Sequence, residues 1–596
     1  MDDLENETAV RDRPDCLVVG ATGFIGRWLV AELLTRGQSV AVTVRGGGVR
    51  GGELRSWLRE HDVDDTRLTV VDADITRPDL ALSASDRERL EDVRDVFNAA
   101  ALYRFGLERE EARRANVDGA LNVLRWAGGL PRLRRLVHVS GYRVGADGAL
   151  TYPVPEAESN ALYRKYGVYE ASKREGDAAV RTAAAEEGVN LTVVNPAGVI
   201  GHSVTGEAGQ YIGPAEMVKN LWAGRLPALA GTRRTFVPVV TIDHLARFMA
   251  AVPDHDEGAY EAHWVLDDAT PELPEMIGLV ARHLGLRAPR AILPAGLVRR
   301  LPRAVTGVEP ETLTFLSEDR YDTTSADTLG LMHPPVEDAL RRWADRLVAE
   351  RFGASRPPLP GGFHLVGNTR TYLAGNRRSP SYVLLHGLPF NAETWRDVVA
   401  ELDAPALVAD MPGLGRSARS AGDATEWLAD LMAPVDSRPV LVGHSAGTAP
   451  VLRYAHAHPE RVAGLVLVSP YFLQRRPRWH MRTPALLAPV LRTASARRLG
   501  RALLGSRDQA LDDMVADLRR PGVAWRTARW LGKAQRRTER DELRALVDDC
   551  PVPVHIVAGE FDPLVGDPVG VPVTVVPGAG HNPQVTHPAQ VAAAAG

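Results

Sequence analysis

A serine, a histidine and an aspartate in the C-terminal half of the chain have the clearest chemical potential. Gly443-His444-Ser445-Ala446-Gly447 follows the apolar run Pro439–Val442 and precedes a helical run from Thr448 to His458. Small residues on both sides allow a tight strand-to-helix turn that exposes the serine hydroxyl. If a histidine takes its proton and an acid orients that histidine, the serine can attack an acyl carbon.

The base and the acid are expected late in the chain. Gly580-His581-Asn582 supplies His581, and the strand-like run Val554–Ala558 leads to Asp562. His587 and Asp567 are nearby alternatives. We interpret His444, inside the turn, as a packing residue.

An acyl-transfer site also needs two donors for the oxyanion. One is the backbone amide of Ala446, directly after the nucleophile. The other is expected in His386-Gly387-Leu388-Pro389-Phe390, after the strand-like run Tyr382–Leu385, and we choose the Leu388 amide.

The N-terminal half begins with a glycine pattern. Gly20-Ala21-Thr22-Gly23-Phe24-Ile25-Gly26 lies between the strand-like run Cys16–Val19 and a helical run from Arg27 to Thr35. Glycines at this place let the backbone approach a pyrophosphate at a helix N-terminus. Arg45 ends the next strand-like run, where an acid would suit NAD, so we expect NADPH.

Tyr169 and Lys173 are four residues apart, which places them on one face of a helix. The lysine can lower the pKa of the phenol and hold the cofactor ribose, so the tyrosine can protonate a carbonyl that receives hydride. Lysine is rare here, because only four of the 71 basic residues are lysines: Lys165, Lys173, Lys219 and Lys533. The position of Lys173 is therefore informative.

Two αβ patterns must position these residues. The alternation of strands and helices predicts an α/β protein with two mostly parallel sheets. We expect a disordered N-terminus (residues 1–13), a first domain (14–352), a linker rich in proline and glycine (353–362) and a second domain (363–596).

Composition excludes several classes of protein. The chain has 596 residues, of which 45% are hydrophobic and 24% are charged, and its net charge of −4 gives no basic field for nucleic acid. No apolar run reaches the roughly 18 residues that span a bilayer, and the polar N-terminus is not a signal peptide. The two cysteines, Cys16 and Cys550, form no disulfide framework. We therefore expect a cytoplasmic protein.

The first half resembles the extended short-chain dehydrogenase/reductases, in particular the dihydroflavonol-reductase-like branch. The resemblance rests on motifs in the family's order, namely Gly20-x-x-Gly23-x-x-Gly26, Thr43-Val44-Arg45, Asp74-Ile75, Asn98-Ala99-Ala100-Ala101, Asn116-Val117-Asp118-Gly119, Tyr169-x-x-x-Lys173 and Asn195-Pro196-Ala197-Gly198-Val199. It implies an N-terminal Rossmann-type doubly wound sheet that binds NADP. It also implies that Asp74 and Ile75 flank the adenine, that Ala99, Ala100 and Ala101 line the pyrophosphate and ribose, and that Pro196 lies by the nicotinamide. Thr22, Phe24, Ile25 and Asn116, within these motifs, belong to the same expected cofactor site.

One position departs from that family. Its catalytic hydroxyl follows the fifth strand, where this chain reads Ser140-Gly141-Tyr142, so Gly141 stands where the hydroxyl is expected. Loss of one donor at such a site typically costs about 10²–10³-fold in rate. Either Ser140 or Tyr142 substitutes, or the domain is a slow reductase, or it binds its cofactor without turnover. We take Ser140 as the candidate.

The second half resembles the α/β-hydrolases, through the elbow, the order Ser445, Asp562, His581, and Asp410-Met411-Pro412-Gly413-Leu414-Gly415-Arg416-Ser417. The serine argues against dehalogenases and epoxide hydrolases, which carry aspartate there. Residues 471–544 lose the strand pattern and are rich in arginine and tryptophan, which predicts a helical cap. Its arginines are either solvated or form a surface for an acidic carrier protein or a phosphorylated thioester arm.

Together these features predict a bifunctional enzyme. An NADPH-dependent ketone or aldehyde reductase is joined to a serine hydrolase of an ester, thioester or lactone. The substrate is a small molecule or an acyl group, which a carrier protein or CoA could hold. The alternative is a serine hydrolase whose first domain only binds NADPH or a partner.

Overall fold

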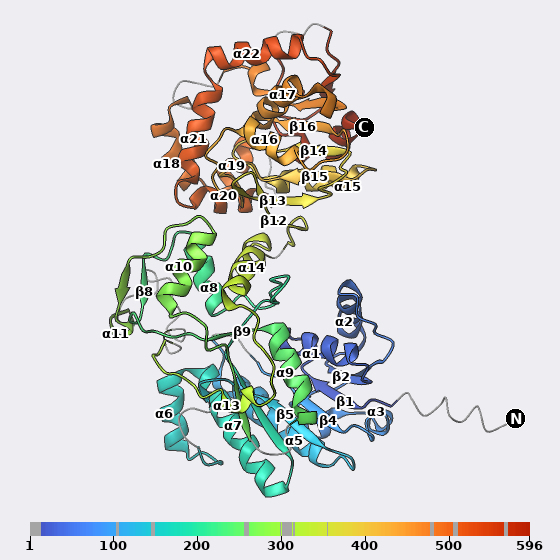
Figure 1. The fold of residues 1–596 in the computed structure, drawn as a ribbon, viewed down its shortest axis with the longest axis vertical. Coiled ribbons are helices and arrows are strands. Elements are labelled where there is room, and N and C mark those ends of the chain that lie inside the picture. Colours follow the sequence, from blue (N-terminus) through green and yellow to red (C-terminus); the bar gives the residue numbers. More distant parts are fainter. Residues whose placement is uncertain are drawn as a thin grey trace, which may run out of the picture. The chain divides into compact units, whose positions relative to one another are not determined.

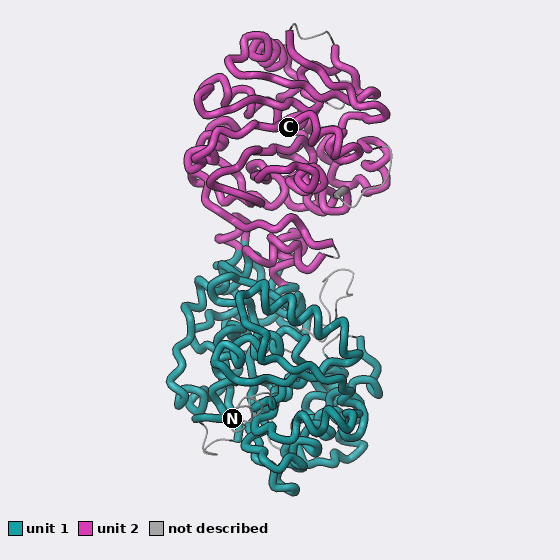
Figure 2. Tube along the Cα trace, turned by 90° about the vertical axis from the view of Figure 1, so that its right-hand side faces the viewer, with its two compact units in different colours: residues 1–216, 227–280, 288–344 teal, residues 217–226, 281–287, 345–596 magenta. Residues whose placement is uncertain are grey.

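The computed structural model describes residues 13–102, 106–144, 150–255, 261–298, 300, 313, 316–354, 356–476, 482–504, 510–565 and 570–596. The chain forms two compact units, shown in different colours in Figure 2. The first comprises residues 1–216, 227–280 and 288–344, and the second comprises residues 217–226, 281–287 and 345–596. The disorder expected at the N-terminus concerns residues that, apart from Arg13, lie outside the described part.

The first unit is built on a parallel sheet of seven strands (Figure 1). The strand order is β10 (Ala262–Val265), β6 (Leu191–Pro196), β5 (Arg135–Val139), β4 (Asp95–Asn98), β1 (Cys16–Val19), β2 (Val40–Val44) and β3 (Leu68–Asp72). Because β1 lies between β2 and β4, the strand order reverses at this point: β2 and β3 lie on one side of β1, and the other strands lie on the opposite side. A crevice forms there at the carboxyl ends of the strands, where such sheets bind dinucleotides. The predicted Rossmann-type sheet is confirmed.

Helices cover both faces of this sheet, as the fully buried β1 requires. Cys16 and Val18 face one core with α1 (Phe24–Thr35), α2 (Gly48–Glu60) and α9 (Ile242–His255). Leu17 and Val19 face the other core with α5 (Gly119–Gly128) and α7 (Val168–Glu187). Alternate residues of a strand point to opposite faces, so four apolar residues in a row serve two cores.

Shorter elements complete the N-terminal part of the chain. They are α3 (Ala84–Arg89), α4 (Arg109–Arg113), a π-helical turn (Arg114–Asp118), α6 (Glu156–Tyr166), β7 (Gly198–Ile200), α8 (Pro214–Trp222), β8 (Ala228–Ala230), β9 (Val239–Thr241), α10 (Leu273–His283), β11 (Ala291–Leu293), α11 (Ala295–Val298), α13 (Thr324–Asp327) and α14 (Val336–Ala349). β7 pairs with β9, and β8 pairs with β11.

The second unit contains a mixed sheet of eight strands. The strand order is β12 (Gly361–Val366), β13 (Thr369–Gly375), β15 (Ala406–Ala409), β14 (Tyr382–Leu385), β16 (Val440–His444), β17 (Gly464–Val468), β18 (Val554–Gly559) and β19 (Val573–Val576). β13 runs antiparallel to both of its neighbours, and the strands from β15 to β19 run parallel. This is the sheet expected of an α/β-hydrolase.

Helices also cover both faces of the second sheet. α16 (Ala424–Met432), α17 (Thr448–Ala457) and α22 (Arg537–Asp548) share one core with it. α15 (Arg396–Glu401) and α24 (Pro588–Ala595) share the other, next to the short α23 (Pro583–Thr586).

The described residues between β17 and β18 form helices and no strand, as predicted for a cap. The cap helices are α18 (Pro484–Thr493), α19 (Ala496–Leu503), α20 (Ala510–Arg519) and α21 (Val523–Ala534), which lead into α22. α18, α20 and α21 share an apolar cluster that includes Phe390, from the loop after β14. The cap therefore packs directly on the segment predicted to supply an oxyanion donor.

The end of the predicted linker is part of the second unit. Leu359 is buried, its amide donates to Glu393 Oε2 at 3.0 Å, and its carbonyl accepts from the Tyr372 hydroxyl. β12 begins at Gly361, two residues before the predicted start of the second domain at residue 363. In the described residues, no helix has both the length and the apolar character needed to cross a membrane.

Candidate active sites

The nucleophile candidate, Ser445, lies on a strained turn between β16 and α17. Its φ is 48°, in the left-handed region of the backbone that residues other than glycine rarely adopt. A Cβ on Gly443 would lie 2.6 Å from the carbonyl oxygen of Gly447, and a Cβ on Gly447 would lie 2.6 Å from that of Leu385. Both flanking glycines are therefore required by close backbone approach.

His581 lies between Ser445 and Asp562. Its Nε2 is 3.0 Å from the Ser445 hydroxyl, and its Nδ1 is 2.6 Å from Asp562 Oδ2. The structure thus brings together three residues that the sequence places 136 and 19 positions apart. Of the alternatives, His587 contacts its neighbour Thr586, and Asp567 lies outside the described residues.

His444 supports the loop that carries His581. Its Nε2 is 3.0 Å from the backbone carbonyl of His581, to which it can donate. Burial and the neighbouring His581 hold the pKa of His444 well below its ordinary value of 6.5, so the ring is neutral. This agrees with its interpretation as a packing residue.

The loop after β14 approaches the nucleophile closely enough to supply an oxyanion donor. A Cβ on Gly387 would lie 2.8 Å from Ser445 Cβ, so the next amide, that of Leu388, is close to the site. The His386 ring fixes this loop, because Nε2 accepts from the Met411 amide at 2.9 Å and Nδ1 lies 3.0 Å from the Gly387 carbonyl. Leu388 and Ala446 are both buried.

Asp410 also fixes the segment that follows β14. Asp410 is fully buried and accepts from the Ala392 amide at 2.7 Å and from the Arg416 amide at 2.8 Å. The Arg416 guanidinium contacts Asp410 at 3.1 Å and Glu393 at 2.8 Å. Burial raises the pKa of Asp410, but the Arg416 charge and these hydrogen bonds outweigh it, so the pKa is lowered and the carboxylate stays ionised.

In the first unit, the glycines of the loop after β1 allow close approach of backbone segments. Gly20 has a φ of 86°, and a Cβ there would lie 2.7 Å from the Ala100 amide nitrogen. A Cβ on Gly26 would lie 2.2 Å from the Gly20 carbonyl oxygen. Gly23 is the N-cap of α1 and no side chain caps this helix, so amides of its first turn have no partner within the helix. In this cradle the backbone segments approach too closely for any side chain, which fits a dinucleotide-binding loop.

The other predicted cofactor residues surround this cradle. Thr22 and Ala101 are exposed, and four neighbours are half-buried: Phe24, Ile25, Ala99 and Ala100. The Ala99 amide donates to the Val19 carbonyl at 3.0 Å, which anchors the end of β4 beside the glycine loop. Pro196 is buried at the end of β6, and its carbonyl accepts from the Tyr142 amide at 3.2 Å.

The adenosine end of the predicted site carries a positive charge. Arg45 is exposed directly after β2. Burial raises the pKa of Asp74, but hydrogen bonds from Thr76 and the nearby charge of Arg45 outweigh it, so the pKa is lowered. Ile75 packs on α5, where a Cβ on Gly119 would lie 3.0 Å from its side chain.

Asn116 contacts protein groups rather than open space. Its side-chain oxygen accepts from the Leu102 amide at 2.8 Å, and its nitrogen donates to the Ser172 hydroxyl at 3.0 Å. It lies on the π-helical turn, and such turns are frequent at functional sites. Asn116 therefore positions the segment of α7 that carries Tyr169 and Lys173.

Lys173 is buried, and its ammonium donates to the Val139 carbonyl at 3.0 Å. Burial lowers its pKa to about 8, partly opposed by Asp177, so the amine is still mostly charged at neutral pH. Tyr169, one turn earlier on α7, is half-buried.

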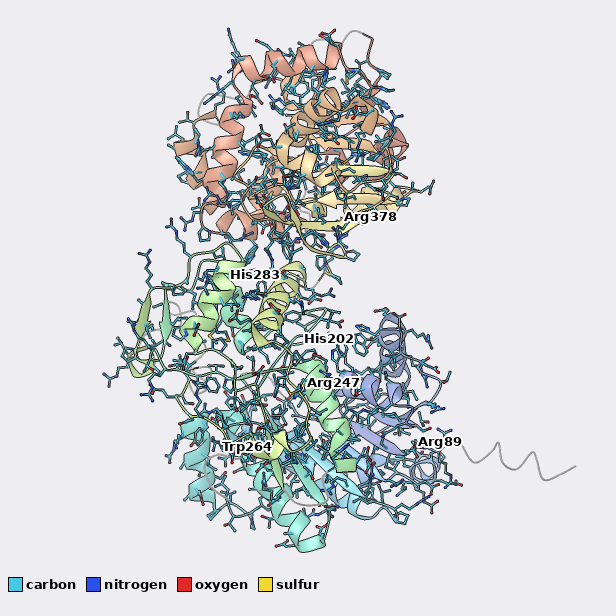
Figure 3. All side chains as sticks on the ribbon, in the orientation of Figure 1. Arg89, His202, Arg247, Trp264, His283 and Arg378 are labelled. Carbon is cyan, nitrogen blue, oxygen red and sulfur yellow. The ribbon has the colours of Figure 1, made fainter. Side chains whose placement is uncertain are left out.

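The segment after β5 leaves a gap where a hydroxyl was expected. Ser140 is buried, and its hydroxyl has no hydrogen-bond partner in the described part of the chain. Tyr142 is also buried, and its carbonyl accepts from the Trp264 indole, labelled in Figure 3, at 2.9 Å. A Cβ on Gly141 would meet only Val144 Cγ2, at 3.5 Å, so nothing fills the place of the missing side chain.

A pocket of about 390 Å³ begins at Val144, beside Gly141. Apolar side chains form one part of its lining, and polar groups form the rest. The residues are Val144, Leu150, Glu158, Ala161, Leu162, Lys165, Tyr166 and Arg174. Arg174 is paired with Glu170 at 2.9 Å, and Glu158 carries a negative charge, so the lining shows no clear preference for a charged group.

Known proteins resemble each half of the chain. Residues 18–249 match the family described as male sterility protein, and residues 382–594 match the alpha/beta hydrolase family. Pimeloyl-[acyl-carrier protein] methyl ester esterase of Edwardsiella ictaluri (strain 93-146) is 30% identical over 245 residues, covering 36% of this chain and 90% of the esterase. Tetraketide alpha-pyrone reductase 1 of Arabidopsis thaliana is 27% identical over 336 residues, covering 54% of this chain and 91% of the reductase. The chain is a reductase-family domain fused to an α/β-hydrolase domain.

A solved structure also resembles the reductase domain. The terminal R domain from the myxalamid PKS-NRPS biosynthetic pathway has a TM-score of 0.46 and 22% sequence identity, and the match covers 58% of this chain and 94% of that domain.

Sequence reasoning missed Gln474 in the hydrolase domain. Its side-chain nitrogen donates to Asp562 Oδ2, the oxygen that His581 also contacts. No motif signals this residue, because it follows a short 3₁₀ turn (Tyr471–Leu473) and lies 88 positions before Asp562.

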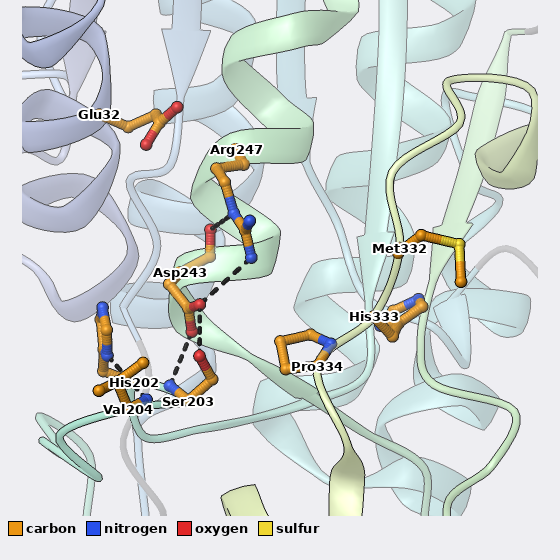
Figure 4. A pocket seen from close by; sticks show the side chains of 9 residues that line it. All are labelled: Glu32, His202, Ser203, Val204, Asp243, Arg247, Met332, His333 and Pro334. Carbon is orange, nitrogen blue, oxygen red and sulfur yellow. Dashed lines mark hydrogen bonds and ion pairs between the residues drawn. The ribbon is translucent and has the colours of Figure 1, made fainter.

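A second pocket of the reductase domain, of about 490 Å³, is lined by none of the predicted cofactor or catalytic residues (Figure 4). Asp243 closes one side, accepting from the Ser203 amide and hydroxyl, both at 2.8 Å, and pairing with Arg247 at 3.3 Å. Its acidic and basic groups bind one another, so the pocket has no clear preference for a charged ligand.

Proposed function

We propose that the chain is a bifunctional enzyme, an NADPH-dependent reductase of a ketone or aldehyde joined to a serine hydrolase of an ester, thioester or lactone. The observation that carries the hydrolase half is the position of His581, 3.0 Å from the Ser445 hydroxyl and 2.6 Å from Asp562. A neutral imidazole in this place can accept the serine proton while the carboxylate stabilises the resulting charge.

The hydrolase reaction follows from that arrangement. Ser445 Oγ attacks the acyl carbon as its proton passes to His581 Nε2, and the carbonyl oxygen becomes an oxyanion facing the Leu388 and Ala446 amides. The intermediate collapses, and the leaving alcohol or thiol takes the proton from His581. Water then attacks the acyl-serine, gives a proton to His581 and releases the acid, and the proton returns to Ser445.

In the reductase half, the chain's own residues bind and orient the cofactor and move one proton. The glycine loop and the start of α1 would hold the pyrophosphate, and Arg45 would hold the 2′-phosphate. Bound NADPH would supply a hydride to the substrate carbonyl. Tyr169 would donate a proton to the carbonyl oxygen, and the charged Lys173 would favour loss of that proton from the phenol.

A second candidate is a hydrolase whose reductase domain binds NADPH without turnover. The observation that favours it is Gly141 itself, which has no side-chain hydroxyl at the position where the family resemblance leads us to expect one. The unpartnered Ser140 hydroxyl supports turnover instead, because a buried hydroxyl without a partner is rare unless a ligand satisfies it.

We further propose an acyl substrate held by CoA or by a carrier protein. One relative acts on a pimeloyl-[acyl-carrier protein] methyl ester, and another, from Pongo abelii, is a fatty acyl-CoA reductase. α19 of the cap carries exposed Arg497, Arg498 and Arg501, which would attract an acidic carrier or a phosphorylated arm. Both cysteines are free thiols, which suits the cytoplasm.

The test follows both reactions in one preparation. NADPH oxidation and ester cleavage are measured separately with keto-acyl esters and thioesters, and a fluorophosphonate probe is used to label the nucleophile. Labelling that is lost in Ser445→Ala, with hydrolysis reduced by several orders of magnitude, would support the hydrolase. Normal hydrolysis by Ser445→Ala would refute it.

A further inference from the structure

Gln474 lies directly against the acid of the proposed hydrolase site. It is buried, and its Nε2 donates to Asp562 Oδ2. His581 Nδ1 lies 2.6 Å from the same oxygen. An ionised carboxylate only accepts hydrogen bonds, so the amide of Gln474 must turn its NH₂ group toward Asp562.

Asp562 needs such a partner because it is not enclosed. Its side chain is 25% exposed, and it lies on the loop after β18. A partly exposed carboxylate can rotate toward water, and the imidazole then loses the partner that fixes its tautomer. Two donors on one oxygen oppose this rotation.

Arg540, on α22, holds Gln474 in place. Its guanidinium is buried and donates to the carbonyl oxygens of Gln474 and Phe472, the latter at 3.2 Å, and to Gln535 Oε1 at 3.0 Å. Burial lowers its pKa to about 10, so it remains charged at neutral pH. Another carboxylate, that of Glu560, lies two residues before Asp562 on the same loop and accepts from the Gly578 amide at 2.7 Å.

We propose that Gln474 is a positioning residue for the hydrolase reaction, which holds the Asp562 carboxylate toward His581 while Arg540 holds Gln474. This proposal rests on the hydrolase function proposed above. The side chain of Gln474 donates to Asp562 and not to Ser445. Its loss should therefore lower kcat and leave KM unchanged.

The experiment compares two nearly isosteric variants in the full chain. Gln474→Met removes the donor and keeps the volume, and Gln474→Glu replaces the donor with a second carboxylate. Gln590→Met, at an exposed position on α24, is the matched control. We measure kcat and KM for a p-nitrophenyl acyl ester and the rate of fluorophosphonate labelling, each from pH 6 to pH 8.

In Gln474→Met, kcat and the labelling rate should fall roughly 10–100-fold, because a hydrogen bond to a charged group is lost. The ratio of its kcat to that of the unmodified protein should not depend on pH. In Gln474→Glu, two facing carboxylates repel each other at pH 8. At lower pH they share a proton, and the protonated carboxyl can again donate to Asp562. The ratio of the kcat of Gln474→Glu to that of the unmodified protein should therefore rise as the pH falls from 8 to 6.

An unchanged kcat in Gln474→Met, or a Glu variant whose ratio is flat across pH, would overturn the positioning role. If Gln474→Met does not fold, the pH ratio of Gln474→Glu carries the test alone. If neither variant folds, Gln474 serves stability and the proposal fails. Failure of the hydrolase function itself is distinct, because the unmodified protein would then lack labelling or hydrolysis that depends on Ser445.

Discussion

Replacing Gly141 with serine should create an efficient reductase. The position follows β5, where the family resemblance leads us to expect a catalytic hydroxyl that glycine lacks. The structure can accommodate the change, because the new Cβ would lie 3.5 Å from Val144 Cγ2, an ordinary contact. The φ of Gly141 lies outside the left-handed region, so a side chain adds no backbone strain.

The expected gain follows from the value of one donor to a developing oxyanion, about 10²–10³-fold in rate. Stability should not fall, because replacing a glycine that has an ordinary backbone conformation reduces the entropy of the unfolded chain by about 0.4–1 kcal/mol. Thermal unfolding of the variant should therefore begin no lower than that of the unmodified protein.

The assay is the oxidation of NADPH with a panel of ketones and aldehydes. Gly141→Ala is the matched control, because it adds the same Cβ without a hydroxyl. The reasoning is wrong if Gly141→Ser reduces no substrate faster than Gly141→Ala while both bind NADPH normally. In that case Ser140 or Tyr142 already supplies the donor, or the domain does not turn over.

Four other predictions concern both domains. Tyr169→Phe should abolish carbonyl reduction and leave NADPH binding intact, as measured by cofactor fluorescence. The protein should bind NADPH about tenfold tighter than NADH or more, because Arg45 can pair with the 2′-phosphate of NADPH. Arg45→Glu should erase this preference, and Arg50→Glu, a control at another exposed position, should leave it unchanged. Gly387→Ala should lower ester hydrolysis by about 10²-fold or more, because its Cβ would lie 2.8 Å from Ser445 Cβ; normal hydrolysis would contradict this. Burial lowers the pKa of Lys173 to about 8, so reductase activity should fall above about pH 8, where the lysine loses its charge. The free energy of unfolding should rise between pH 8 and 10.5, because in this range the unfolded chain keeps the proton and the folded chain does not.

Residues at the carboxyl ends of strands could be predicted from the sequence. Ser445, Asp562 and the glycine loop each follow an apolar run, and the parallel sheets gather these ends on one edge. The observed β14 (Tyr382–Leu385) has the bounds expected from the sequence, and β18 extends one residue further, to Gly559. Apolar runs bounded by glycine and proline are a strong local signal for buried strands.

Contacts between irregular segments could not be predicted. Gln474 reaches Asp562 across 88 positions, and Phe390 enters the apolar cluster of the cap. Neither contact produces a periodic pattern in the sequence, because each depends on the conformation of a loop that packs on the sheet. Asn116 shows a related limit, since its motif marks a functional segment while its amide binds Leu102 and Ser172.

The strand orders of the two sheets have a consequence for synthesis on the ribosome. In the first sheet, β1, β2 and β3 are neighbours, and β4, β5, β6 and β10 then join the other edge in the order in which they are made. The nascent chain can therefore extend this sheet one strand at a time. In the second sheet, β14 is made before β15 but ends between β15 and β16, and β13 has only β12 as a partner until β15 emerges. A pause that leaves β14 outside the ribosome while β15 is still inside it would expose the unpaired edges of β13 and β14, which is the condition under which nascent chains aggregate.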